Sequence, residues 1–431
     1  MKFSPMQIAH VDLAEHAPPP RSDGRPMLAV LWWRDLPLGM VAAAAEETPF
    51  SSATLASHLA RFAAEQRAAR DPALGAPLRG TYDGRPEDRL RIREARDAQG
   101  TLGWLDSVSR LPPCSAADLS VVICTRDRGP HLAACLASLA SQQSPPGEIV
   151  VVDNSAAGDA RPLCEARSDV RYVHEPRPGL SHARNAGIRA ASRQIVAFTD
   201  DDVQPHPLWT SEVARVFSEG ENAPDAMTGL VLPARLDTPA QVFFQMRMGG
   251  FGSRFVPVRF DRLLYENTQA QGAHVWHIGA GANMAFRRAI FDRVGLFDTR
   301  LGAGASGCSE DSEMWYRIIA TGGTCQYEPR AVVRHDHRDS WRALHSQMRA
   351  YQNGHVSALV AQADRFGDRG NLRRIFRQLP SYFLRELFES VQAQEPERRR
   401  VLAEELRGWA SGLRYVVDRR WRGKSSEKGP R

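Results

Sequence analysis

The stretch Gln194-Ile-Val-Ala-Phe-Thr-Asp-Asp-Asp-Val203 decides the fold that we expect. It begins as a short apolar run, which is typical of a strand buried in a parallel sheet. Three carboxylates, Asp200, Asp201 and Asp202, follow this run directly. Ligands bind beyond the carboxyl ends of the strands in open parallel sheets, so we expect the three side chains in a cleft. The alternative is an acidic turn that caps the next helix.

The residues that precede this stretch repeat the same pattern. Short apolar runs predict strands, and segments with apolar residues at helical spacing predict helices between them. The expected strands are 119–124, 148–152, 170–173 and 194–198, and the expected helices are 131–142, 162–166 and 181–191. Strands alternating with helices predict an α/β fold with a Rossmann-like, mostly parallel sheet flanked by helices.

The acidic cluster suggests a metal ion. Adjacent carboxylates repel one another, and a hard divalent cation such as Mn²⁺ or Mg²⁺ makes such a cluster tolerable. Two other strand ends carry polar residues, Thr125 with Arg126 or Arg128, and Asp153. A hydroxyl and a carboxylate can bind a nucleoside, and arginines can bind its phosphates. An ordinary turn at Asp153 and surface ion pairs for the arginines are the alternatives.

Two glycine-bearing stretches lie further along. Residues 179–185 open a helix after a proline-rich turn, and helix N-termini favour phosphate. Residues 302–307 match the GxGxxG pattern, but no buried strand precedes them, so we reject a dinucleotide site. We expect this stretch, like residues 279–284, to be a substrate loop.

Five segments together resemble the family 2 glycosyltransferases, which have the fold called GT-A. They are residues 120–128, 148–154, 179–187, 198–202 and 307–315. The resemblance implies an inverting enzyme that uses a nucleotide-sugar donor, with uridine diphosphate as the common carrier. Cys124 and Arg126 depart from the commoner Pro-Thr-Tyr form of the first motif, which leaves base selectivity open.

The resemblance also implies roles for individual residues. Thr125, Arg126, Asp153, Arg184, Asn185, Asp200 and Asp201 are expected to bind the donor, and Asp200, Asp202 and His335 the metal. Glu310 and Asp311 form the late acidic pair, with Asp311 as the catalytic base. Chemically, inversion needs one base near the acceptor hydroxyl and charge neutralisation at the departing diphosphate. A plain helix N-cap is the alternative role for Asp311.

The chain divides into three expected parts: an N-terminal accessory domain (1–115), a glycosyltransferase domain (116–345) and a helical C-terminal extension with a basic tail (346–431). The first part is expected to hold a hairpin over 27–33 and 40–45 and a helix over 54–69. Later, we expect a helix over 311–320, strands over 324–327 and 331–334, and helices beyond Trp341. The tail, with Arg398, Arg399, Arg400, Arg419, Arg420 and Trp421, suggests peripheral contact with an anionic membrane. A solvated helix is the alternative.

Composition narrows the class of protein. Apolar residues make up 42% and charged residues 25%, which is typical of a globular protein. We find no signal peptide, so we expect a protein that is cytoplasmic or peripheral on the inner face of the cell membrane. The net charge of +6 alone does not indicate a nucleic-acid partner.

The acceptor stays open between a glycan, a lipid-linked molecule and a small molecule. A nucleotidyltransferase and a non-catalytic scaffold are the competing functions.

Overall fold

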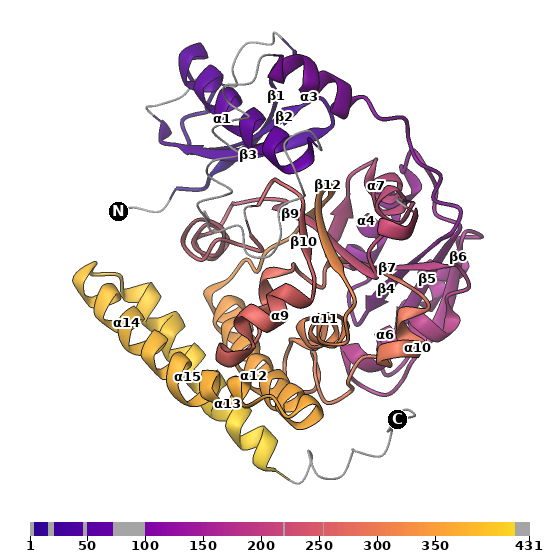
Figure 1. Cartoon of the computed structure of the whole chain (residues 1–431), viewed down its shortest axis with the longest axis vertical. Coiled ribbons are helices and arrows are strands. Elements are labelled where there is room, and N and C mark those ends of the chain that lie inside the picture. The colour runs from indigo at the N-terminus through magenta and orange to yellow at the C-terminus, as the bar shows by residue number, and fades with distance from the viewer. Residues whose placement is uncertain are drawn as a thin grey trace.

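The computed structural model describes residues 4–15, 21–45, 50–71, 100–218, 220–252 and 254–418. Its centre is a nine-stranded sheet in the order β10-β12-β9-β11-β7-β4-β5-β6, with β8 added beside β12. Six strands point one way and β8, β10 and β11 point the other way. The expected α/β fold with a mostly parallel sheet flanked by helices is therefore confirmed (Figure 1).

The parallel half of the sheet follows the expected strands closely. It consists of β4 (Leu119–Thr125), β5 (Glu148–Asp153), β6 (Val170–His174) and β7 (Ile195–Asp200). The helices between these strands are α4 (Gly129–Ala140), α5 (Arg161–Glu165) and α6 (Leu180–Ala190). Each lies within two residues of the range expected from the sequence. The apolar runs predict these elements well because both faces of each central strand are buried.

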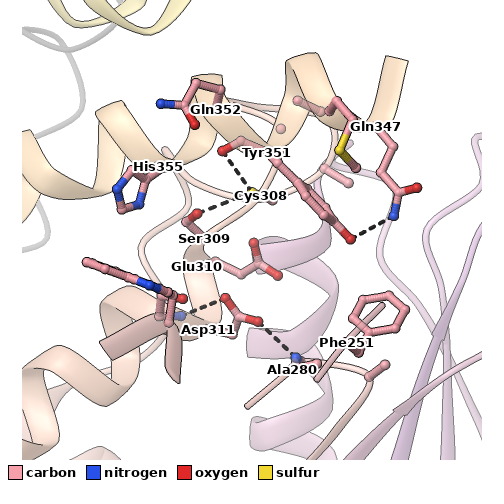
Figure 2. Close-up of a pocket in the computed structure, with 18 of the residues that line it drawn as sticks. Phe251, Ala280, Cys308, Ser309, Glu310, Asp311, Gln347, Tyr351, Gln352 and His355 are labelled. Carbon is pink, nitrogen blue, oxygen red and sulfur yellow. Dashed lines mark hydrogen bonds between the residues drawn. The ribbon is translucent and has the colours of Figure 1, made fainter. Parts of the chain in front are cut away.

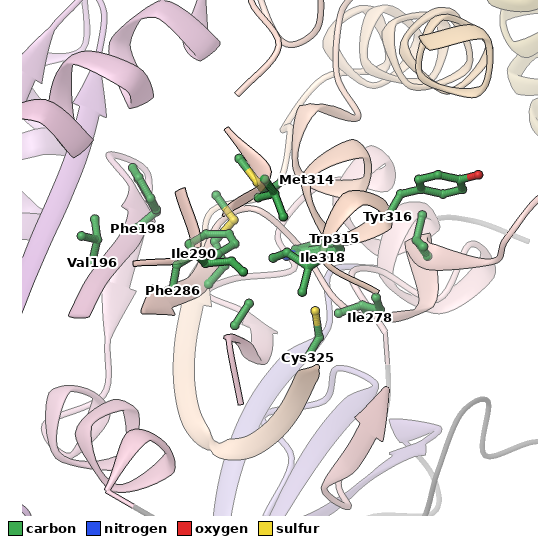
Figure 3. Close-up of a cluster of buried hydrophobic side chains, with 14 of the residues drawn as sticks. Val196, Phe198, Ile278, Phe286, Ile290, Met314, Trp315, Tyr316, Ile318 and Cys325 are labelled. Carbon is green, nitrogen blue, oxygen red and sulfur yellow. The ribbon is translucent and has the colours of Figure 1, made fainter. Parts of the chain in front are cut away.

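Side-chain alternation along β4 builds two core layers. Val121 and Ile123 join the cluster beneath α4 and α7 (Trp209–Phe217), whereas Val122 joins the cluster beneath α6 and α11 (Glu310–Ala320). Successive residues of a strand point to opposite faces, so one strand serves both layers. Figure 3 shows the second layer, where Trp315 of α11 lies among apolar side chains from several strands. Burying a side chain of this size stabilises the fold by about 3 kcal/mol.

The second half of the sheet differs from the sequence expectation. A single strand, β12 (Cys325–His335), replaces the two expected over 324–327 and 331–334, with an irregularity in its pairing between Glu328 and Val332. Four further strands were not expected: β8 (Val203–Pro205), β9 (Ala226–Pro233), β10 (Val258–Phe260) and β11 (Asn283–Arg287). β11 runs antiparallel between β7 and β9, a long-range pairing that local periodicity does not reveal.

The N-terminal residues form a separate three-stranded sheet. The expected hairpin is present as β2 (Met27–Trp33) and β3 (Leu36–Ala43), although the second strand begins earlier than expected. β1 (Gln7–Asp12) pairs with β2, and α1 (Ser52–Arg70) and α3 (Thr101–Ser109) pack on this sheet. Trp32 joins Leu230 and Val332 in one apolar cluster, which fixes this unit against the large sheet.

The C-terminal residues are helical, as expected. α12 (Trp341–Phe366), α13 (Arg369–Arg373), the π-helical turn η7 (Arg374–Gln378), α14 (Leu379–Gln392) and α15 (Pro396–Val417) follow one another. α12 lies nearest to the sheet, and α14 lies at the outer edge of the molecule (Figure 1). None of the helices in the described ranges is both long and apolar enough to span a bilayer.

The expected basic tail is only partly within the described residues. Arg398 pairs with Glu386 and Glu389 of α14, and Arg400 pairs with Glu397. Arg398 therefore joins α15 to α14, whereas the Arg400 pair lies within α15, and contact of this tail with a membrane stays a prediction. Arg419, Arg420 and Trp421 lie outside the described residues.

Candidate active site

A cavity of about 1420 Å³ lies at the carboxyl ends of β4 and β7 and reaches the C-terminal helices. Nine of the eleven expected site residues line it: Thr125, Arg126, Arg184, Asp200, Asp201, Asp202, Glu310, Asp311 and His335. Asp153 and Asn185 do not. The fold thus gathers most of the expected residues from segments far apart in the chain.

The three aspartates after β7 have different environments. Asp201 accepts a hydrogen bond from the Thr125 hydroxyl at 2.8 Å, and Arg128 Nη1 bridges Asp201 and Asp202 at 3.0 and 2.8 Å. Burial raises the pKa of Asp201, whereas His335 and Arg128 outweigh burial and lower the pKa of Asp202. The Asp200 side chain is 34% exposed and faces the cavity. Burial of its carboxyl raises its pKa to about 7, and Asp202 and Asp201 add to the rise.

The predicted metal ligands are only partly gathered. His335 Nε2 lies 3.4 Å from Asp202 Oδ1, about the separation of two ligands on one cation. Asp200 turns instead toward Arg184 Nη2, at 3.6 Å. Within the described ranges, no three His, Cys, Asp or Glu side chains form a ready metal site. Asp202 and His335 therefore fit a divalent cation that takes its other ligands from a bound diphosphate and water, as Mg²⁺ commonly does.

The two residues of the late acidic pair, Glu310 and Asp311, have different hydrogen-bond partners. Glu310 is buried and forms an ion pair with Arg184, which joins the first turn of α11 to α6. Burial raises the pKa of the Glu310 carboxyl, and Arg184 opposes that rise. Asp311 accepts hydrogen bonds from the backbone N–H groups of Gly281 at 2.8 Å and Ser312 at 2.6 Å. Figure 2 shows Asp311 between the loop at Ala280 and the segment from Cys308 to Glu310, with Tyr351 of α12 opposite.

The cavity depends on a close approach at Gly281. A Cβ atom there would lie 2.8 Å from Asp311 Oδ2 and 3.0 Å from Arg184 Nη2. Gly281 is thus a site residue, and the sequence analysis had placed it only within a substrate loop. Residues of the second expected loop, Ala303, Gly304 and Gly307, also line the cavity. Gly304 and Gly307 have φ values of +85° and +109°, which suit glycine.

Two expected donor ligands have structural partners. The Asp153 carboxylate is fully buried and accepts the N–H groups of Ser155 and Ala160 and the hydroxyl of Tyr172. Asn185 forms two hydrogen bonds with the backbone of Phe297. Asn154, not Asp153, lines the cavity at this strand end. Both residues hold the walls of the site in place, and their direct contact with a donor stays a prediction.

Two contributors to this site, Arg338 and Trp276, were not expected from the sequence, and a third, Arg128, differs from its expected role. Arg128 was named only as an alternative to Arg126, yet it is Arg128 that reaches the aspartates, while the Arg126 side chain is 52% exposed. Arg338 lies 3.5 Å from Asp202 Oδ2. Its position three residues after His335 is the only sequence signal for it. Nothing in the local sequence marks Trp276, which also lines the cavity.

Comparison with known proteins identifies the family. Residues 120–295 match the family model described as glycosyl transferase family 2, and residues 238–393 match that of glycosyl transferase family group 2. The chain is 30% identical over 232 residues to the succinoglycan biosynthesis protein ExoM of Rhizobium meliloti, covering 51% of this chain and 67% of that protein.

Other relatives match at lower sequence identity. The pre-mycofactocin glycosyltransferase of Mycobacterium tuberculosis is 27% identical over 289 residues, which cover 64% of this chain. The match spans only 55% of the length of that relative. The mannosyltransferase PcManGT from Pyrobaculum calidifontis, solved with GDP-Man and Mn²⁺, aligns over 83% of this chain and 97% of its own, with 19% identity and a TM-score of 0.48. The family matches favour sugar transfer over nucleotidyl transfer or a non-catalytic scaffold. The chain belongs to the family 2 glycosyltransferases.

Proposed function

We propose that the protein transfers one sugar from a nucleotide-diphosphate sugar, with uridine diphosphate the expected carrier, to an acceptor hydroxyl with inversion. The observation that carries this proposal is the setting of Asp311. Two backbone N–H groups hold its carboxylate at the wall of the cavity that the aspartates after β7 and the C-terminal helices also line. These hydrogen bonds fix the orientation of the carboxylate, the group that would accept a proton as a general base.

The reaction follows from this arrangement. Asp311 takes the proton of the acceptor hydroxyl, and the acceptor oxygen forms a bond to the anomeric carbon of the donor. The bond from that carbon to the diphosphate oxygen breaks on the opposite face, and the nucleoside diphosphate leaves with the electron pair. Thr125 and Asn154 lie where the nucleoside would bind, and Arg126 lies where phosphates would bind.

Asp202 and His335 would hold a Mn²⁺ or Mg²⁺ ion, which would neutralise charge on the diphosphate. Contacts with neighbouring residues hold these two side chains in fixed positions. His335 Nδ1 lies 3.1 Å from His337 Nδ1, so its Nε2 faces Asp202. Burial lowers the pKa of His335, which favours the neutral imidazole that binds metals.

The test is donor turnover by the purified protein with a panel of nucleotide sugars, in Mn²⁺, Mg²⁺ or EDTA. We expect metal-dependent release of nucleoside diphosphate from one donor. NMR of the transferred sugar should show the opposite anomeric configuration. Retention, or no turnover of any donor by the folded protein, would overturn the proposal.

The acceptor belongs to the same proposal. ExoM is named for succinoglycan biosynthesis. A second relative is the glucosyl-dolichyl phosphate glucuronosyltransferase of Haloferax volcanii. These names support a glycan or lipid-linked acceptor, in the biosynthesis of a glycoconjugate. Each acceptor class can be added to the donor assay in turn, and the true acceptor should raise the turnover of donor.

A further inference from the structure

The cavity continues past Asp311 into a region that the proposed reaction does not use. We name this region the C-terminal arm. The residues that line it come from the 3₁₀ turn at 275–277 and from α12, η7, α14 and α15. They are Trp276, His355, Arg374, Arg377, Gln378, Ser381, Tyr382, Arg385 and Glu405. The arm shares one cavity with Asp311 and with the aspartates that follow β7, so a molecule bound in the arm has access to the proposed base.

Arg374 is held rigidly in the arm without an acidic partner. Its guanidinium lies over the Trp276 ring, with Cζ 3.9 Å from the ring centroid. Nε donates to His355 Nε2 at 3.0 Å, and Nη1 donates to Gln378 Oε1 at 3.2 Å. Burial lowers the pKa of His355 to about 3, so this partner is neutral. Each of these partners orients the guanidinium, and none of them carries a negative charge.

Two more arginines extend the positive charge along the same wall. Within the described ranges, Arg377 has no carboxylate within 4.0 Å, and Arg385 has only Glu389, at the 4.0 Å limit. The arginines near the β7 aspartates differ, because Arg128, Arg184 and Arg338 all contact carboxylates there. The one acidic residue lining the arm is Glu405. Three guanidinium groups against one carboxyl group make this arm complementary to an anion.

The neighbouring face of α14 is apolar and exposed. Leu384, Phe388 and Val391 repeat at helical spacing and are 70%, 64% and 52% exposed. Phe376 and Leu387 extend this patch, which we name the apolar stripe. Arg385 lies next to it in the helix and lines the arm. α14 is also at the outer edge of the molecule (Figure 1). Single exposed apolar residues are ordinary, but a contiguous group on one helix indicates an interaction surface.

We propose that the C-terminal arm binds the phosphate group of a lipid-linked acceptor, and that the apolar stripe lies on the membrane that carries this lipid. The inference rests on the proposed function, because it names the acceptor of that reaction. Guanidinium groups bind phosphate through two parallel hydrogen bonds, and the oriented Arg374 is the group best placed to do so. The adjoining stripe would bury its side chains in the lipid surface while the arginines stay at the headgroups.

The test is co-sedimentation of the full chain with three kinds of phosphatidylcholine vesicle: plain, with farnesol, and with farnesyl phosphate. We expect the farnesyl phosphate vesicles to bind the most protein. Arg374→Gln should weaken that preference by about tenfold or more, the effect of losing a charge-assisted hydrogen bond. The double substitution Leu384→Ser with Phe388→Ser should weaken binding to every vesicle.

Two matched variants control for unrelated effects. Arg373 is the adjacent arginine, but it donates to the carbonyl of Ala270 and does not line the arm. Arg373→Gln should therefore leave the phosphate preference unchanged. Leu102, 50% exposed on α3, is far from the stripe in sequence, and Leu102→Ser should leave vesicle binding unchanged. Thermal unfolding of each variant shows whether it is folded.

The outcomes separate this inference from the proposed function. Equal binding to the three vesicles, or an unchanged preference in folded Arg374→Gln, overturns the phosphate site. Unchanged vesicle binding by the folded double variant overturns the membrane face. In a competition experiment, inorganic phosphate and dispersed farnesyl phosphate are each added to protein bound to farnesyl phosphate vesicles. Equal release of protein by the two compounds also overturns the membrane face. Donor turnover by the unmodified protein without phosphate-dependent binding contradicts only this inference. Phosphate-dependent binding without donor turnover contradicts only the proposed function.

Discussion

The guanidinium of Arg184 pairs with the carboxylate of Glu310 across the floor of the cavity, although 126 positions separate the two residues in the chain. Both side chains are almost fully buried, at 2% and 5% exposed. The pair joins α6, which lies between β6 and β7 in the chain, to α11, which carries Asp311. Both charged groups lose their hydration on burial, and their attraction for each other compensates for this loss. If one partner is removed, the other charge stays buried without compensation.

Breaking this pair should therefore destabilise the fold strongly. We expect Arg184→Gln to lower the free energy of unfolding by about 3–5 kcal/mol, the usual effect of leaving one buried charge unpaired. Urea denaturation measures it. Arg262 and Glu266 form a matched exposed pair at 2.7 Å, so Arg262→Gln should change stability by less than about 0.5 kcal/mol. Similar losses in the two variants would contradict this account.

The base role of Asp311 predicts a loss of rate without a loss of donor affinity. Asp311→Asn keeps the shape of the side chain and one oxygen to accept from Gly281 or Ser312, but it cannot take a proton. We expect transfer to fall by about 10²–10⁴-fold. Donor binding measured by calorimetry should hardly change. Asp127, 61% exposed and outside the cavity lining, provides the control. If Asp127→Asn lost as much activity, the effect would not be specific to the base.

Arg128 occupies a position that a metal ion would compete for. Its Nη1 lies 2.8 Å from Asp202 Oδ2, on the carboxylate that also faces His335. Removing this competing charge with Arg128→Gln should tighten the binding of Mn²⁺ in the absence of donor, by up to about fivefold for an ion pair worth about 1 kcal/mol. Electron paramagnetic resonance of free Mn²⁺ measures the affinity. Asp202→Asn should weaken Mn²⁺ binding, and an unchanged affinity in both variants would place the ion elsewhere.

The sequence predicted the parallel half of the sheet because its signals are local. The buried runs before Thr125, Asp153 and Asp200 each end in a polar residue. The fold brings all three strand ends to the cavity, the second of them through Asn154. Pairing between distant segments has no such signal. The strand β9 lies beside β11 and β12 through contacts that only the assembled sheet defines.

The sequence also could not predict which of Arg126 and Arg128 would contact the aspartates. Asp127 between them has a φ of +57°, a left-handed conformation that few residues other than glycine adopt. Across this turn Arg126 stays largely exposed, while Arg128 reaches Asp201 and Asp202. The C-terminal arm was equally hidden, since Trp276 and Arg374 are 98 positions apart and meet only in the folded chain.

Close packing behind the Asp311 segment gives a further prediction. A Cβ atom on Gly354 of α12 would lie 2.4 Å from the carbonyl oxygen of Cys308 and 2.6 Å from its nitrogen. Gly354→Ala must push α12 away from the segment that leads to Asp311. We expect a loss of about 1–3 kcal/mol in the free energy of unfolding, as for other overpacked sites. Transfer activity should fall as well.

Gly103 is the matched control for Gly354. It lies within the helix α3, and a Cβ atom there would meet nothing within 4 Å. Gly103→Ala should leave stability unchanged or raise it by up to about 1 kcal/mol, because alanine favours helices. A stable, fully active Gly354→Ala protein would show that α12 does not fix the segment from Cys308 to Asp311.

Glu405 predicts how stability depends on pH. Burial raises the pKa of its carboxyl to about 7, Glu386 adds to the rise, and the Tyr382 hydroxyl, 3.4 Å away, opposes it. The folded protein therefore holds this proton more tightly than the unfolded chain does. Its contribution to stability is complete below the ordinary carboxyl pKa, near 4.5, and is lost as the pH rises through about 7. At 1.4 kcal/mol per pKa unit, the loss is about 3 kcal/mol at most.

Glu405→Gln removes this proton, so it isolates the effect. Near pH 5 the free energies of unfolding of the variant and the unmodified protein should be similar. Near pH 8 the variant should be the more stable, by about 1–3 kcal/mol. Urea denaturation across this pH range measures the difference. The exposed Glu266 on α9 (Arg262–Thr268) is the control, and Glu266→Gln should show no such change between the two pH values. A constant difference between Glu405→Gln and the unmodified protein would mean that Glu405 does not titrate in this interval.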